Sequence, residues 1–185
     1  LTAYKLMLAK TRYKLGKYQE SIRDCQNFLA DYPNSEYVDD VTYLMANNHY
    51  RLKEYTDAVR FWVKAAGMTS DSRLARITLR HAENAMAFRL EKEELRKINQ
   101  QNPPGSVIRD MALYFLADRY YREGDLSSTN DVIQTIIESG STSVYAQKAQ
   151  DLESFIQFKK DNVVRIAALL PLTGANSEVG TGLYE

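Results

Sequence analysis

The chain has 185 residues, of which 44% are hydrophobic and 26% are charged, a balance that is ordinary for a globular protein. Its 24 basic residues equal its 24 acidic residues and no long basic run is present, so the sequence does not favour a nucleic-acid-binding protein. The longest apolar run, near residues 163–172, is interrupted by Arg165 and is too short for a membrane-spanning helix. The single cysteine, Cys25, excludes an internal disulfide.

A stretch over residues 13–29 returns at residues 50–66 and, with more changes, at residues 121–137. The first two copies are 37 residues apart, and the third lies 108 residues after the first, which is three steps of 36. A period of this size is typical of a stacked array of helical units. One further unit is therefore expected between the second and third clear copies, over about residues 72–104.

Each copy predicts a pair of helices joined by a tight turn. Apolar residues recur at helical spacing in the first half of each copy. Gly16 and Gly124 follow at the turn, where a left-handed backbone conformation favours glycine. Lys53 occupies this position in the second copy, so the second turn is expected to be strained. The small residues Ser21 and Ala58, with Thr129 in the third copy, stand where the second helix must approach the first.

Helices are expected in chain order over residues 1–15, 19–31, 37–52, 55–67, 107–123, 126–138 and 143–160, with one more pair from residue 72 that breaks near residues 89–91. Residues 100–106, which include two prolines, give the firmest break. The last helix should cover the open end of the array, because each unit buries its apolar face only against neighbours. Its apolar stripe is Tyr145, Ala149, Leu152, Phe155 and Ile156.

The repeat resembles the tetratricopeptide repeat over roughly residues 1–140. That family places a small residue in the first helix, Gly-x-Tyr at the turn, a small residue in the second helix and a closing proline. In the first unit these are Ala9, Gly16-Lys17-Tyr18, Ser21 and Pro33. The family's usual tryptophan is missing, since Lys5, Thr42 and Leu113 stand near its place. The resemblance implies an all-α domain over residues 1–160, a right-handed superhelix of antiparallel helix pairs.

In that family, certain positions of each first helix line a concave groove that binds a protein or peptide partner. On this sequence they fall on Lys10, Tyr13, Lys14, Tyr43, Asn47, Tyr50, Arg51, Tyr114, Asp118, Tyr121 and Arg122. Tyrosine and arginine are favoured in recognition surfaces. The alternative is that the tyrosines pack between helices, with their hydroxyls at the rim. The family's carboxylate clamp is not supported, because Leu6 and Lys10 replace its first lysine and asparagine.

The composition changes after Lys160. Residues 163–170, VVRIAALL, are β-branched or aliphatic and predict a strand buried on both faces, as in a parallel sheet. Residues 163–185 resemble the opening of a type I periplasmic binding protein, the extracellular ligand-binding receptor family, in which an apolar strand runs into Leu-Pro-Leu-Thr-Gly. The resemblance implies that residues 161–185 are a short β-forming tail from a truncated α/β domain. Its incomplete ligand-cleft loop would contain Thr173, Gly174, Ser177 and Glu178.

The sequence shows no nucleophile elbow, phosphate loop or metal motif. His49 and His81 are 32 residues apart and have no cysteine or histidine at ligand spacing. The carboxylates are expected at helix starts and on solvated faces. We therefore expect no enzyme activity in this chain, with no catalytic residue, no cofactor and no metal. Cys25 aligns with core positions of the other copies and is expected to be buried.

These features predict a protein–protein interaction scaffold of a bacterial extracytoplasmic solute receptor, related to the substrate-binding proteins of ABC transporters. The expected location is the periplasm, with anchoring in the outer membrane as a lipoprotein as a further option. A protein or peptide partner is expected in the groove, and a small-molecule ligand only in the full-length protein. One alternative is an outer-membrane lipoprotein that activates a peptidoglycan synthase, a penicillin-binding protein activator. Another is an enzyme whose active site lies beyond Glu185.

Overall fold

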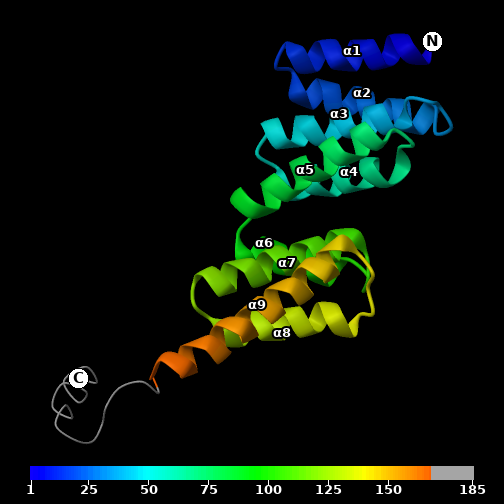
Figure 1. Cartoon of the computed structure of the whole chain (residues 1–185). Helices are drawn as coiled ribbons and strands as arrows, with labels where there is room; N and C mark the ends of the chain where they lie inside the picture. The colour runs from blue at the N-terminus through cyan, green and yellow to red at the C-terminus, as the bar shows by residue number, and fades with distance from the viewer. Residues whose placement is uncertain (168–185) are drawn as a thin grey trace, which may run out of the picture.

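The computed structural model describes the backbone of residues 1–167 and the side chains of residues 1–160. This part of the chain contains nine helices and no strand, and Figure 1 shows the helices as an elongated stack with α1 at one end and α8 and α9 towards the other. Their bounds are α1 Thr2–Lys14, α2 Tyr18–Asp31, α3 Val38–Arg51, α4 Tyr55–Met68, α5 Ser72–Phe88, α6 Lys92–Gln101, α7 Val107–Arg122, α8 Leu126–Glu138 and α9 Val144–Ala167. The prediction of an all-α fold over residues 1–160 is confirmed.

The three clear copies of the repeat form the three helix pairs α1–α2, α3–α4 and α7–α8, and α2 also packs on α3. Each pair is joined by a tight turn with one residue at positive φ. These residues are Gly16 at 75°, Lys53 at 65° and Gly124 at 81°. Lys53 is the one non-glycine residue at positive φ in the described chain, so the strain expected at the second turn is confirmed.

Small residues allow the paired helices to approach closely. Ser21, Ala58 and Thr129 are all buried, as predicted. The Ser21 hydroxyl of α2 donates to the Ala9 carbonyl of α1 at 2.9 Å. It also accepts from the Asn48 side-chain amide of α3 at 2.9 Å, so one hydroxyl ties three successive helices together. Buried hydrogen bonds of this kind favour one arrangement of the helices, because a buried donor without a partner is costly.

Cys25 lies in the first hydrophobic cluster, together with Ile22, Phe28 and Val41. Its thiol is fully buried, and burial raises its pKa to about 12. The prediction of a buried, structural cysteine is confirmed, because a thiol needs exposure and a low pKa to react.

The expected middle unit does not form a helix pair. The chain breaks at residues 89–91 as predicted, and Asp71 caps α5 by accepting from the Arg73 backbone N–H at 2.8 Å. However, α5 packs along α4 and α6 packs along α7, while α5 and α6 make little contact with each other. Figure 1 shows α5 beside α4 and α6 beside α7. The array is therefore interrupted between α5 and α6.

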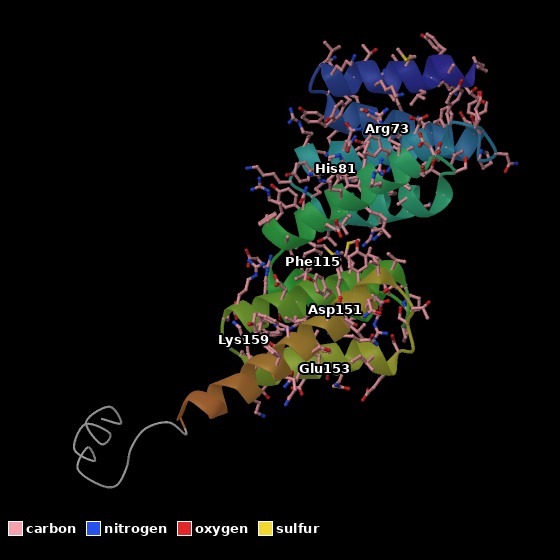
Figure 2. The ribbon with its side chains drawn as sticks, viewed as in Figure 1. Arg73, His81, Phe115, Asp151, Glu153 and Lys159 are labelled. Carbon is pink, nitrogen blue, oxygen red and sulfur yellow. The ribbon has the colours of Figure 1, made fainter. Side chains whose placement is uncertain are left out.

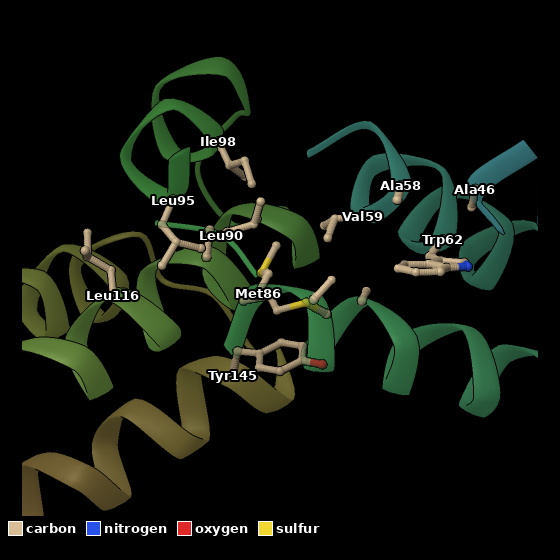
Figure 3. Packing of buried hydrophobic residues seen from close by; sticks show 14 of the residues in the cluster. Ala46, Ala58, Val59, Trp62, Met86, Leu90, Leu95, Ile98, Leu116 and Tyr145 are labelled. Carbon is tan, nitrogen blue, oxygen red and sulfur yellow. The ribbon is translucent and has the colours of Figure 1, made fainter. Parts of the chain in front are cut away.

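Buried side chains bridge this interruption. One hydrophobic cluster runs from Trp62 of α4 through Met86 of α5 and Leu90 of the link to Leu95 of α6 and Tyr145 of α9. Figure 3 shows Met86, Leu90 and Leu95 near one another, with Tyr145 beside Met86 and Trp62 further along, next to Ala46. The two parts therefore share one core, in which each fully buried large apolar side chain contributes about 1.5–3 kcal/mol relative to an exposed one.

Polar contacts fasten α9 to α5 across the same junction. The Tyr145 hydroxyl donates to the Glu83 carboxylate at 3.0 Å, and the Lys148 ammonium lies 3.1 Å from the same carboxylate oxygen. α9 also packs over α7 and α8, so the expected cover for that end of the array is present. In its predicted stripe Tyr145, Ala149 and Ile156 are buried, whereas Phe155 is largely exposed.

α9 continues beyond its predicted end at residue 160 and is described as far as Ala167. Residues 163–167, where a strand was predicted, are therefore helical, and this part of the prediction is wrong. A helix pairs its backbone groups internally, whereas a strand needs a neighbouring strand, and none is present in residues 1–167. The rest of the predicted strand lies outside the described residues, as do Thr173, Gly174, Ser177 and Glu178.

Candidate interaction groove

A pocket of about 340 Å³ lies where α1, α3, α4 and α5 meet. Four of its lining residues, at positions 43, 47, 50 and 51, come from α3, where helical spacing puts them on one face. Five of the predicted groove residues line it, namely Tyr13, Tyr43, Asn47, Tyr50 and Arg51. The structure adds three that the sequence reasoning missed, Trp62, His81 and Asn84.

Trp62 is the most deeply buried of the lining residues. Its indole Nε1 donates to the Asn47 side-chain oxygen at 3.0 Å, which fixes the orientation of both side chains. The indole centroid lies 5.4 Å from the Tyr50 ring and 5.3 Å from the His81 ring. These separations are typical of favourable aromatic contacts, so the wall of the pocket is a packed aromatic surface.

His81 joins α5 to this aromatic group, and Figure 2 labels it on that helix. Its ring stacks on Tyr43 with centroids 6.2 Å apart and an interplanar angle of 28°, and the Tyr43 hydroxyl lies 3.4 Å from His81 Nε2. Desolvation of the ring lowers the pKa of His81, and the nearby charge of Arg80 lowers it further. The lowered pKa favours the neutral form of His81.

Arg51 supplies the charge at the pocket. Its guanidinium Nε donates to the Tyr18 hydroxyl at 3.0 Å, and its Cζ lies 5.6 Å from the centre of that ring. The hydrogen bond raises the pKa of Arg51. Of the eight lining side chains only Arg51 is charged at neutral pH, and none is a carboxylate. The pocket thus combines aromatic faces, two amides and one cation, a set that suits a neutral or acidic peptide segment.

The remaining predicted groove residues of the first half of the chain lie outside this pocket. Lys10 of α1 forms an ion pair with Asp40 of α3 at 3.8 Å, and Lys14 is exposed. In the second half, Tyr114 packs against Phe115, with centroids 5.2 Å apart, and against Tyr145 at 6.3 Å. Tyr114 therefore packs against neighbouring aromatic rings, as in the alternative in which the tyrosines pack between helices.

The last three predicted residues lie near the other end of the molecule. Asp118 forms an ion pair with Arg122, with 2.8 Å between the carboxylate oxygen and Arg122 Nε. Tyr121 and Arg122 line a second pocket of about 630 Å³, together with Gly124, Leu126, Ile156, Lys159 and Lys160. Figure 2 labels Lys159 on α9, and its ammonium lies 6.0 Å from the centre of the Tyr121 ring. The predicted groove residues are thus divided between two places in the array.

No side-chain cluster in the described part of the chain contains the three or more His, Cys, Asp or Glu residues that could hold a metal ion. Among the helices of residues 1–167, none has the length and apolar character needed to cross a membrane.

The family model of the tetratricopeptide repeat matches residues 3–35. This stretch comprises most of α1, all of α2 and the start of the connection to α3. No match is found among curated proteins. This match to the tetratricopeptide repeat, at one end of the all-helical stack of residues 1–167, is consistent with a scaffold for protein–protein interaction.

Proposed function

We propose that this chain is a protein-interaction scaffold that holds a peptide segment of a partner protein against the pocket formed by α1, α3, α4 and α5. One observation carries the proposal: five groove positions expected from the repeat gather with Trp62 and His81 around a single pocket. Rigid aromatic side chains give contact area at low entropic cost, and the helices that hold them are tied to one another by buried contacts.

The chemistry of the pocket supports binding rather than catalysis. His81 has a tyrosine hydroxyl and an indole beside it, and no carboxylate lines the pocket to orient or charge its ring. Arg51 is directed by Tyr18 and offers its remaining N–H groups to an acidic group of the partner.

A selected peptide tests this proposal. A random peptide library displayed on phage is selected on the wild-type chain, and the affinity of a selected peptide is measured by fluorescence anisotropy. Arg51→Ala should weaken binding about tenfold, because it removes the single charged group of the pocket. Arg23→Ala, which changes an exposed arginine of α2 outside the pocket, is the matched control and should bind like the wild type. Equal affinities for all three proteins would refute the proposal.

We also propose that the scaffold belongs to an extracytoplasmic ligand-binding receptor, located in the periplasm. The support is the resemblance of residues 163–185 to the opening of a periplasmic binding domain, and the activator of a peptidoglycan synthase remains the second proposal. Thermal shifts of the natural full-length protein with amino acids, short peptides and cell-wall fragments separate the two. A shift with one small-molecule class supports the receptor, and no shift with any class supports the activator. Recovery of the tagged protein in the cytosolic fraction would contradict both.

A further inference from the structure

The aromatic pocket has arginines at one of its ends. Tyr43 and Tyr50 lie about two turns apart on the face of α3 that lines the pocket, so they mark its two ends. Arg51 lines the pocket beside Tyr50. Arg89, which directly follows α5, hydrogen-bonds to the Tyr50 hydroxyl, and this bond raises the pKa of Arg89. Two guanidinium groups therefore stand at the Tyr50 end.

A third arginine stands at the opposite end. Arg80 directly precedes His81 on α5, and its positive charge is near enough to lower the pKa of His81. The His81 ring stacks on Tyr43, with centroids 6.2 Å apart. Helical spacing also places Arg80 one turn before Asn84, which lines the pocket. Arg80 therefore adds a positive charge at the Tyr43 end.

The charges of these arginines are not neutralised by the rest of the described chain. Arg51, Arg80 and Arg89 are exposed, and none of them forms an ion pair within residues 1–160. The carboxylates nearest to them in the sequence are paired with other residues, namely Glu54 with His49, Glu83 with Lys148 and Glu91 with Arg119. Uncompensated positive charge around a pocket without carboxylates favours an acidic partner.

The spacing of the arginines limits the shape of that partner. Arg80 and Arg89 are nine positions apart, which corresponds to about 13 Å along a helix axis. An extended peptide advances about 3.3 Å per residue, so about four residues span the same distance. The aromatic wall with Trp62 lies between the two ends and suits an apolar side chain.

The pocket lies within the array rather than at its end. α3 supplies half of the lining residues and has α2 packed on one side and α4 on the other. His81 and Asn84 of α5 nevertheless remain exposed at the pocket. The pocket is therefore accessible although the helix at its centre already has its neighbours in the array.

Building on the peptide site of the proposed function, we propose that its partner segment is an extended acidic peptide with a carboxylate on each side of an apolar residue, the two carboxylates about four residues apart. The apolar side chain packs against Trp62. One carboxylate pairs with Arg80, and the other pairs with Arg51 and Arg89, whose tyrosine partners leave several guanidinium N–H groups free to donate.

The phage-displayed library of the proposed function tests this inference. Selected peptides should share two acidic residues about four positions apart with an apolar residue between them. For one such peptide, Arg80→Ala and Arg89→Ala should each weaken binding about threefold in fluorescence anisotropy, since each removes one partly solvated charge pair. Replacing one carboxylate of the peptide by its amide should abolish the effect of Arg80→Ala, and replacing the other should abolish the effect of Arg89→Ala.

Two controls separate pairing at fixed positions from general charge attraction. Arg23→Ala removes the same charge from an exposed site on α2 and should bind the peptide like the wild type. A peptide of identical composition with its two acidic residues adjacent should bind at least about threefold more weakly. Because Arg80 and Arg89 are exposed, both variants should keep the wild-type helical content, which circular dichroism verifies.

The failure of this inference differs from the failure of the pocket as a peptide site. Selected peptides that need Arg51 but lack paired acidic residues, or that bind Arg80→Ala and Arg89→Ala as tightly as the wild type, would overturn this inference alone. Equal affinity for the wild type and for all three arginine variants would overturn both. Displacement of the peptide by an equal concentration of oligothymidylate would also overturn the inference, because the arginines would then serve a nucleic-acid strand.

Discussion

At the scale of single residues, Trp62 shows how a core position becomes part of a recognition surface. It aligns with Cys25 and Ile133, which are fully buried core residues of the other copies. The indole is larger than either side chain, so it also reaches Asn47 and the rings of Tyr50 and His81. A tryptophan at a position where the other copies have smaller side chains was the feature of the sequence that could have predicted Trp62 as a pocket residue.

The contact between Trp62 and His81 predicts a pH dependence. Burial lowers the pKa of His81, so its protonation in the folded chain should have a midpoint below the usual 6.5. A protonated imidazole quenches a neighbouring indole, so the emission of Trp62, the single tryptophan, should fall through this range on acidification. His81→Gln should abolish the titration, and His49→Gln, which changes the other histidine, should retain it. A titration that survives in His81→Gln would contradict the assignment.

The lowered pKa of His81 also makes the stability of the folded chain depend on pH. The unfolded chain binds the proton at a higher pH than the folded chain does, because the folded pKa of His81 is lowered. Stability therefore rises with pH across the interval between the two pKa values and is lost as the pH falls through it. The partial exposure of the ring keeps this contribution small.

At the scale of elements, the three turns inside the clear repeat copies share one backbone feature. Each contains one residue at positive φ, whereas the α5–α6 link has Arg89 at −123° and Glu91 at −82°. A left-handed residue is not required for successive helices to pack, because α4 and α5 pack along each other across a link with Thr69 at −78° and Asp71 at −77°. α6 packs on α7 rather than on α5.

Lys53 allows a direct test of the backbone strain at the second turn. Lys53→Gly should raise the free energy of unfolding by about 1 kcal/mol, because glycine adopts the left-handed conformation without the steric cost of a β-carbon. Chemical denaturation of the two proteins measures the change. The reciprocal variant Gly124→Ala should lose a similar amount, because a β-carbon at position 124 would meet no atom within 4 Å and only the conformational cost remains. A destabilised Lys53→Gly would show that this turn is not strained.

The repeat made most helix bounds predictable, because local spacing, glycine turns and prolines act within a few residues. α3 was expected over residues 37–52 and spans Val38–Arg51. The pairing of α5 was not predictable in this way, because it depends on a turn that departs from the repeat. The helical course of residues 163–167 was missed because aliphatic residues suit both a buried strand and a helix.

The candidate site was predictable only for the helices that carry the repeat's groove positions. Tyr43, Tyr50 and Arg51 share one face of α3, and helical spacing alone places them together. Asn84 and His81 come from the divergent unit, in which no position aligns with the groove positions of the repeat. Their place beside Tyr43 follows from the packing of α5 on α4.

At the scale of the whole molecule, one core connects the two parts of the interrupted array. Leu90 lies fully buried in the link between α5 and α6, within the cluster that also contains Trp62 and Tyr145. Such a continuous core should make unfolding cooperative across the interruption.

Leu90→Ala tests this continuity. The cavity should cost about 2–5 kcal/mol, and urea should unfold the variant at one lower midpoint, whether followed by Trp62 emission or by helical circular dichroism. Phe88→Ala removes a neighbouring but exposed side chain and should change stability by less than about 0.5 kcal/mol. A Trp62 transition that stays at the wild-type midpoint while the ellipticity shifts would show that the two parts unfold independently.

The molecule thus presents an aromatic pocket where α1, α3, α4 and α5 meet. The most direct measurement of the central claim uses Trp62, which is the single tryptophan and lies in the pocket. Emission is recorded while the wild-type chain and Arg51→Ala are titrated with a library-selected peptide. We predict a saturable change in wild-type emission with the same Kd as anisotropy, and a Kd about tenfold higher for Arg51→Ala. Binding that leaves Trp62 emission unchanged and is equally tight in Arg51→Ala would contradict the account.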